Sequence, residues 1–126
     1  MARILIVEDN PDLLMILDQL LSVEHEVLTA RRGEDGIALV RTERPDVVIL
    51  DVQLPSMDGI EAGIWMKRET QPAPVPILVL TGLAGAADQE AILASGCCDL
   101  YLAKPAPLAR IRESVDQLLS GARTLL

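Results

Sequence analysis

The chain of 126 residues has no phenylalanine, one tryptophan and one tyrosine, so its core must be built from aliphatic side chains. It also lacks long hydrophobic runs, since none approaches the roughly 20 residues that a membrane-spanning helix needs. The N-terminus, MARILIVEDN, has one arginine and a short apolar run that acids end. This run is too short for a signal peptide, and it predicts a cytoplasmic protein without a membrane anchor.

Basic residues are scarce. Eleven Lys and Arg stand against 19 Asp and Glu, for a formal net charge of −8. Because phosphate backbones are bound by basic faces, no direct contact with nucleic acid is expected. An acidic surface suits a solvated monomer or a basic protein partner.

Thiol and imidazole ligands are scarce too. The two cysteines, Cys97 and Cys98, are adjacent. A disulfide between neighbours is strained and two thiols make a poor zinc site, so both are expected to be reduced and structural. The single histidine, His25, precedes a predicted strand with no second ligand at an evident spacing, and is interpreted as a strand-end residue.

The sequence does contain a fivefold alternation of short aliphatic runs and amphipathic stretches. Runs rich in Ile, Val and Leu and bounded by turn residues are typical of buried parallel strands. They cover residues 3–7, 26–30, 46–50, 76–81 and 99–103. Helical spacing of apolar residues predicts helices over 11–22, 34–44, 58–69, 87–95 and 107–120. The pattern predicts an α/β fold, (βα)₅, with a doubly wound five-stranded parallel sheet in one domain over residues 1–126.

Each helix has a face that is expected to cover the sheet. These faces include Leu13, Ile16 and Leu17 in the first helix, Ile60, Ile64 and Met66 in the third, Ala91, Leu93 and Ala94 in the fourth, and Leu108, Ile111 and Val115 in the fifth.

Polar residues follow four of the five runs. Glu8 and Asp9 follow the first, Asp51 the third, Thr81 ends the fourth and Lys104 follows the fifth. Ligands of open parallel sheets bind at the carboxyl ends of the strands, so these residues are expected at one edge. Three carboxylates held together repel one another unless a cation joins them. Oxygen ligands without His or Cys indicate Mg²⁺ or a similar ion such as Mn²⁺.

A lysine and a hydroxyl beside such a metal site suit an incoming phosphoryl group, whose negative charge needs cationic and hydrogen-bonding partners. One carboxylate can then act as the nucleophile and form an acyl phosphate. Each residue alone has an ordinary alternative: a helix cap or solvated acid for the carboxylates, a strand-end residue for Thr81, a surface turn for Lys104. Their joint placement favours the phosphoryl site.

The motifs VED, DVQLPSMDG, LTG and YLAKP, in this order, resemble the receiver domain of two-component response regulators over nearly the whole chain. The resemblance implies the flavodoxin-like receiver topology, with strand order 2-1-3-4-5. It implies that Asp51 accepts a phosphoryl group from a histidine kinase or a histidine phosphotransfer protein. Such a domain catalyses only its own phosphorylation and dephosphorylation.

The same resemblance implies a role for each matching position. Glu8, Asp9, Asp51 and the backbone carbonyl of Gln53 would hold the metal ion. Thr81 and Lys104 would contact the phosphoryl oxygens, and the Lys104–Pro105 peptide bond would be cis.

Switching is implied as well. Inward movement of the Thr81 hydroxyl toward the phosphoryl group would vacate space that Tyr101 fills. The face made by the fourth helix, fifth strand and fifth helix would then change its affinity for a downstream effector protein. The expected state is a monomer or a phosphorylation-dependent dimer, with no output domain in this chain. Leu83 is apolar where some receivers carry a polar group that helps to orient the hydrolytic water, which predicts a long-lived phosphoryl group.

Three other functions remain as alternatives. A flavin-binding flavodoxin would need a Ser/Thr/Gly-rich loop after the first strand, where this chain reads EDNPD. A phosphatase of the haloacid dehalogenase type would need a second aspartate two residues after Asp51, where Gln53 stands. A receiver that serves mainly as a docking or dimerisation module within a hybrid kinase or larger regulator is the third.

Overall fold

The computed structural model describes residues 1–83 and 85–124. Strands and helices alternate along the chain, and the predicted bounds hold to within one residue except at the end of the last helix. The elements are β1 (Arg3–Val7), α1 (Pro11–Leu21), β2 (Glu26–Ala30), α2 (Gly33–Glu43), β3 (Val47–Leu50), α3 (Gly59–Glu69), β4 (Ile77–Thr81), α4 (Ala86–Ala94), β5 (Leu100–Ala103) and α5 (Leu108–Thr124). None of the helices in these described ranges is long and apolar enough to span a membrane.

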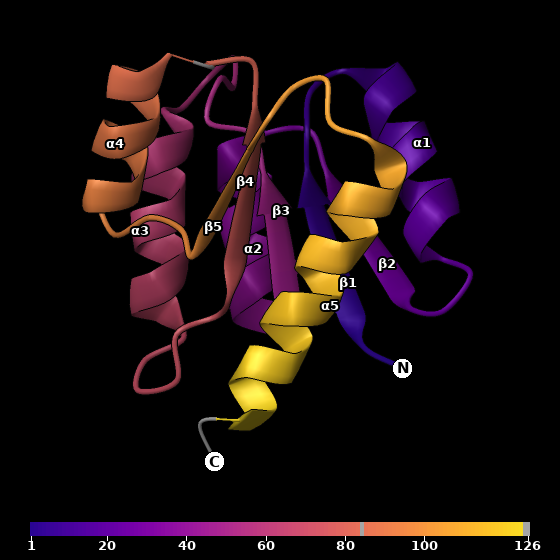
Figure 1. Ribbon diagram of the computed structural model, residues 1–126. Coiled ribbons are helices and arrows are strands. Elements are labelled where there is room, and N and C mark those ends of the chain that lie inside the picture. Colours follow the sequence, from indigo (N-terminus) through magenta and orange to yellow (C-terminus); the bar gives the residue numbers. More distant parts are fainter. Residues whose placement is uncertain (84, 125–126) are drawn as a thin grey trace.

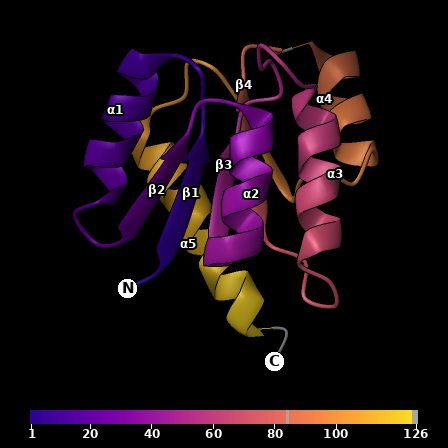
Figure 2. The same ribbon diagram turned by 180° about the vertical axis from the view of Figure 1, so that it is seen from behind.

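All five strands are parallel and form one sheet in the order β2-β1-β3-β4-β5. Helices α1 and α5 cover one face (Figure 1), and α2, α3 and α4 cover the other (Figure 2). Because the strands are parallel, every crossover carries the chain back to the edge where the strands begin, and the carboxyl ends of all five strands meet at the opposite edge. The doubly wound (βα)₅ fold and its strand order are confirmed.

The alternation of side chains along each strand divides the core into two layers. On β1, Ile4 and Ile6 pack toward α1 and α5, whereas Leu5 and Val7 pack toward α2 and α3. All four are fully buried. Because both faces of the sheet are covered, the central strands are apolar throughout, and polar groups appear only where the strands end.

Two of the predicted helix faces are wrong, that of α4 entirely and that of α3 in part. In α4, Ile92 is the buried residue, whereas Ala91, Leu93 and Ala94, which were expected to face the sheet, are all exposed. In α3, the buried residues are Gly59, Ala62, Gly63 and Met66, and the two isoleucines are only half-buried. Small residues are buried because α3 lies close to its neighbours: a Cβ on Gly63 would come within 2.7 Å of the carbonyl oxygen of Cys97.

The predicted faces of α1 and α5 each include one residue that is exposed. Ile16 of α1 is 42% exposed and Leu108 of α5 is 44% exposed, whereas Leu17 and Ile111 are buried as predicted. Both exposed residues lie at the margin of an otherwise correct face.

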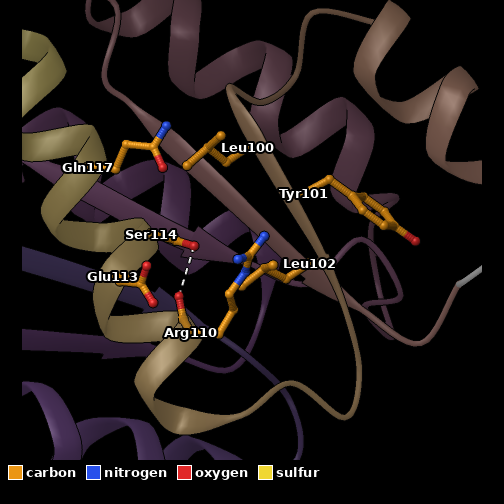
Figure 3. A pocket seen from close by; sticks show the side chains of 7 residues that line it. All are labelled: Leu100, Tyr101, Leu102, Arg110, Glu113, Ser114 and Gln117. Carbon is orange, nitrogen blue, oxygen red and sulfur yellow. Dashed lines mark hydrogen bonds between the residues drawn. The ribbon is translucent and has the colours of Figure 1, made fainter.

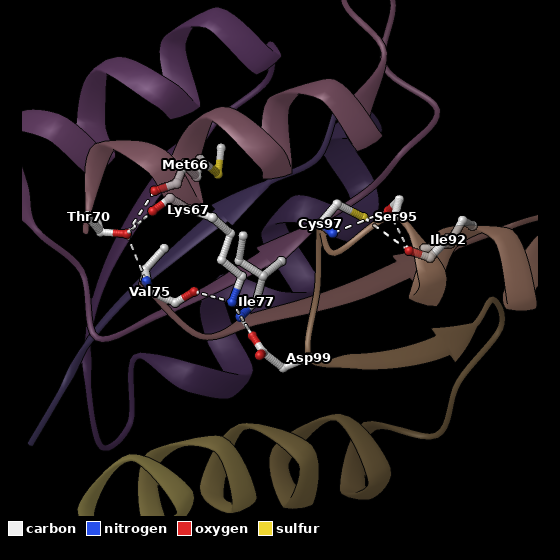
Figure 4. Close-up of polar contacts among 9 residues, drawn as sticks. All are labelled: Met66, Lys67, Thr70, Val75, Ile77, Ile92, Ser95, Cys97 and Asp99. Carbon is white, nitrogen blue, oxygen red and sulfur yellow. Dashed lines mark hydrogen bonds and ion pairs between the residues drawn. The ribbon is translucent and has the colours of Figure 1, made fainter. Parts of the chain in front are cut away.

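The connection between α3 and β4 is held by polar contacts (Figure 4). The Lys67 ammonium donates to the Val75 carbonyl at 2.8 Å and to Asp99 Oδ2 at 2.5 Å. The same carboxylate oxygen accepts from the Ile77 N–H at 2.8 Å. Thr70 Oγ1 accepts from the Val75 N–H at 2.8 Å. These contacts join the end of α3 to the starts of β4 and β5, at the sheet edge opposite the strand carboxyl ends.

Candidate functional site

The carboxylates of Glu8 and Asp51 lie side by side because β1 and β3 are neighbours. Val7 pairs with Leu50 in the register, and the Asp51 N–H donates to the Val7 carbonyl at 3.1 Å. Each acid is therefore the first residue beyond its strand. Glu8 is 2% exposed and Asp51 is 4% exposed. Two acids buried this far need partners for their charge.

Lys104 supplies that partner from across the sheet. Its backbone N–H donates to the Thr81 carbonyl at 2.8 Å, which extends the β4–β5 pairing by one residue. Its ammonium lies 2.7 Å from Asp51 Oδ2 and 2.8 Å from Glu8 Oε1. One cation thus bridges two buried carboxylates. The peptide bond between Lys104 and Pro105 is cis.

The electrostatics follow from this burial. Burial raises the pKa of Glu8, and the hydrogen bonds from Lys104 and from the Asn10 N–H, at 3.1 Å, oppose that effect. Burial also works to lower the pKa of Lys104, but its hydrogen bonds with Asp51 and Glu8 outweigh it and raise the pKa. The lysine is therefore charged at neutral pH, and two carboxylates share its charge.

A third acid, Asp9, completes the group. Carboxylate oxygens of Glu8, Asp9 and Asp51 all lie within 4.8 Å of one another. An all-oxygen donor set that holds more negative charge than one lysine neutralises fits a hard divalent cation such as Mg²⁺. Gln53 borders the group, and its backbone N–H donates to Asp51 Oδ1 at 2.9 Å.

The loop after β3 closes over Asp51 because of a glycine. The Gly59 N–H donates to the Val52 carbonyl at 3.0 Å. A Cβ on Gly59 would lie 2.2 Å from Val52 Cα and 2.5 Å from the Asp51 carbonyl oxygen. Asp58 caps α3, its Oδ1 accepting from the Ile60 N–H at 2.9 Å. Only a residue without a side chain allows α3 to begin this close to the end of β3.

Thr81 lies fully buried at the end of β4. Its hydroxyl oxygen accepts from the Leu83 N–H at 3.4 Å. The Tyr101 hydroxyl in turn donates to the Leu83 carbonyl. Tyr101 lies on the side of β5 away from α5 (Figure 3). Burial raises its pKa, and the charge of Asp88 adds to this. The backbone of Leu83 is therefore hydrogen-bonded to both predicted switch residues, Thr81 and Tyr101.

A small cavity of about 90 Å³ borders the same strand on its α5 side. Its lining comes from β5 and α5 (Figure 3): Leu100, Tyr101, Leu102, Arg110, Glu113, Ser114 and Gln117.

The family model for the response regulator receiver domain matches residues 4–116. The chain belongs to this family. It is 34% identical over 122 residues to the protein PilH of Pseudomonas aeruginosa, which covers 96% of this chain and 100% of PilH. It is 31% identical over 120 residues to the polar-differentiation response regulator DivK of Brucella anthropi, covering 94% of this chain and 97% of DivK.

Solved structures of receivers agree with the fold. A CheY-like receiver domain protein from Methanospirillum hungatei has a TM-score of 0.89 at 26% identity, covering 100% of this chain and 99% of that one. The receiver domain of the sensor histidine kinase PA1611 from Pseudomonas aeruginosa has a TM-score of 0.84 at 29% identity. The match covers 94% of this chain and 98% of that domain's chain. That structure has a magnesium ion coordinated in its active-site cleft. The chain is thus a receiver domain of two-component signalling.

The predicted metal and phosphoryl residues lie at the carboxyl edge of the sheet, whereas Tyr101 lies within β5, opposite Val79. The structure adds two contacts that the motifs did not indicate. Arg31 Nη2 donates to the Asp9 carbonyl at 3.1 Å, and the Asn10 N–H donates to Glu8. Arg31 directly follows β2, so the rule that placed the acids at strand ends also applies to it. The sequence pattern did not indicate Arg31, because a basic side chain is not expected among the ligands of a metal ion.

Proposed function

We propose that this receiver takes a phosphoryl group on Asp51 from a phosphohistidine, carried by a histidine kinase or a histidine phosphotransfer protein. The observation that supports this most directly is the pairing of a buried Asp51 with Lys104, 2.7 Å away, beside two further acids. A structural ion pair needs one acid for one lysine, whereas this site holds three carboxylates. The surplus negative charge suits a divalent cation, and the lysine suits a phosphoryl oxygen.

In the proposed step, a carboxylate oxygen of Asp51 attacks the phosphorus atom and forms a new O–P bond. The P–N bond of the donor breaks, and its electron pair stays on the imidazole nitrogen. Glu8, Asp9, Asp51 and the Gln53 carbonyl would hold Mg²⁺ or Mn²⁺, which supplies positive charge to the phosphoryl oxygens. Lys104 exchanges part of its contact with Asp51 for a phosphoryl oxygen, and the Thr81 hydroxyl donates to another.

The output in this proposal is the face of α4, β5 and α5. Thr81 and Tyr101 both bind the backbone of Leu83, so a hydroxyl that turns toward the phosphoryl group releases the Leu83 N–H. The loop that Tyr101 holds then changes position relative to β5. An effector protein that binds this face better in one of the two arrangements reads the phosphorylation.

The test is incubation with acetyl phosphate and Mg²⁺, followed by intact mass measurement. The parent protein is expected to gain the mass of one phosphoryl group, and a chelator in place of Mg²⁺ is expected to prevent the gain. Asp51→Asn should remain unmodified. Asp58→Asn is the matched control in the same loop, because it keeps the capping oxygen of α3, and it should gain the group normally. An adduct that persists undiminished in Asp51→Asn rejects Asp51 as the acceptor.

A further inference from the structure

A second surface lies between α2 and α3, on the face of the molecule shown in Figure 2. It is a groove of about 300 Å³, lined by Glu34, Ile37, Ala38, Arg41, Met57 and Trp65. Trp65 is the single tryptophan of the chain, and it is 41% exposed. A large aromatic side chain beside an apolar groove is typical of a protein interface. The phosphoryl site uses none of these residues.

The order of the residues along α2 is self-complementary. Glu34, Ile37, Ala38 and Arg41 are spaced i, i+3, i+4 and i+7, so they share one side of the helix. This stripe has an acid at one end, a base at the other and two apolar residues between. If a second such stripe is laid antiparallel on the first, each acid meets a base and the apolar residues meet one another.

Contacts within the chain hold the end groups of the stripe in place. Arg41 donates to the two carboxylate oxygens of Glu69 at 3.0 and 3.2 Å. Glu34 accepts from Ser56 at 2.8 Å and from Arg32 at 3.2 Å. Fixed charges lose little conformational entropy when a partner binds them.

The charge balance of the groove favours another copy of the chain over a strongly basic protein. Glu34 and Arg41, the two charged residues that line the groove, cancel each other on a chain whose net charge is −8. A strongly basic partner would find no excess of negative charge here. Two acidic copies of the chain, in contrast, meet with the least repulsion at a neutral patch.

We propose that the groove is a docking surface for a second copy of this chain. The two copies are related by a two-fold axis, with their α2 helices antiparallel. Glu34 of each copy faces Arg41 of the other, and Trp65 of each covers the apolar residues of the other stripe. The groove is small, which places the contact among weak and transient interfaces. The inference does not depend on phosphorylation of Asp51, and it concerns a face other than α4, β5 and α5.

The test uses the unphosphorylated protein at micromolar to millimolar concentrations. Sedimentation is expected to show a monomer–dimer equilibrium, and the fluorescence of Trp65 is expected to shift to shorter wavelength along the same curve. Glu34→Arg and Arg41→Glu each place like charges opposite one another, and each is expected to weaken the dimer about tenfold or more. An equimolar mixture of these two variants restores both opposite-charge pairs, so it should form a heterodimer nearly as strong as the wild type.

Two further measurements make the result decisive. Circular dichroism and thermal unfolding check that each variant is folded, and Glu90→Arg, on the exposed surface of α4, is the charge control that should dimerise normally. A protein that stays monomeric throughout the concentration range overturns the proposal. The proposal is also overturned if neither α2 variant weakens the dimer, or if Glu90→Arg weakens it, because the interface then lies elsewhere. Failure of the mixture to recover overturns the antiparallel arrangement.

Discussion

Lys104 is the residue on which the charge balance of the site depends. In Lys104→Met, Glu8 and Asp51 remain buried and adjacent without their shared cation. In the presence of a chelator, the free energy of unfolding is expected to fall by about 3 kcal/mol, since two buried carboxylates lose their shared partner. Mg²⁺ should reduce this deficit, because it supplies the missing positive charge. Urea unfolding with chelator and with Mg²⁺ measures both effects.

Lys67→Met is the matched control for that experiment. Lys67 also pairs with an acid, Asp99, at 2.5 Å, but at the opposite edge of the sheet. Its loss should destabilise the protein by an amount that Mg²⁺ does not change. If the loss of unfolding free energy in Lys104→Met is also unchanged by Mg²⁺, the cation does not bind beside Lys104.

The apolar side chain of Leu83 is expected to lengthen the lifetime of the phosphoryl group on Asp51. Its side chain packs against the buried core, and its backbone is held by Thr81 and Tyr101. It therefore offers no side-chain group to orient a water molecule for hydrolysis. With Mg²⁺ and no phosphatase, the adduct on Asp51 is expected to decay slowly, and Leu83→Gln should speed the decay. Intact mass measured over time tests this, and loss within seconds in the parent protein contradicts it.

At the scale of an element, the start of α3 depends on Gly59. In Gly59→Ala the new methyl group would meet the backbone of Asp51 and Val52, so the helix must shift away from β3. The expected cost is about 3 kcal/mol in the free energy of unfolding, as for overpacking in a core. Gly121→Ala, inside α5, is the control, because, apart from its neighbours and the backbone of its own helix, no atom of the described part of the chain lies within 4 Å of its new Cβ. It should raise stability by up to about 1 kcal/mol through helix propensity. Equal effects of the two changes would contradict the close approach.

The helix faces show how far periodicity predicts packing. Apolar spacing identified every helix, but in α4 it chose Leu93 where Ile92 is buried. That helix is rich in alanine, so several rotations about its axis bury similar apolar area. In α3, the close approach to its neighbours selects small residues. Such choices depend on distances between elements, which periodicity within one element does not contain.

At the level of the whole molecule, the acids that would hold the metal ion come from neighbouring strands that are far apart in the sequence. Glu8 and Asp9 extend β1, and Asp51 extends β3, so a bound cation stabilises the folded sheet against global unfolding. Mg²⁺ is expected to raise the unfolding midpoint progressively, reaching about 2.7 kcal/mol of stabilisation at 100 times its dissociation constant. Asp9→Asn should weaken this response. Thermal unfolding in a Mg²⁺ series measures it, and equal responses of both proteins would remove Asp9 from the metal site.

The (βα)₅ order, the parallel sheet and the set of polar residues at the strand ends can all be predicted from the sequence, because they follow from local periodicity and from where apolar runs stop. Which of these residues touch depends instead on how the strands are ordered in the folded sheet. The strand order puts Glu8 beside Asp51, and the reach of Lys104 across β4 brings one ammonium to both. The groove beside Trp65 could not be predicted from the sequence for the same reason. Its walls come from two helices whose separation depends on how they pack against the sheet.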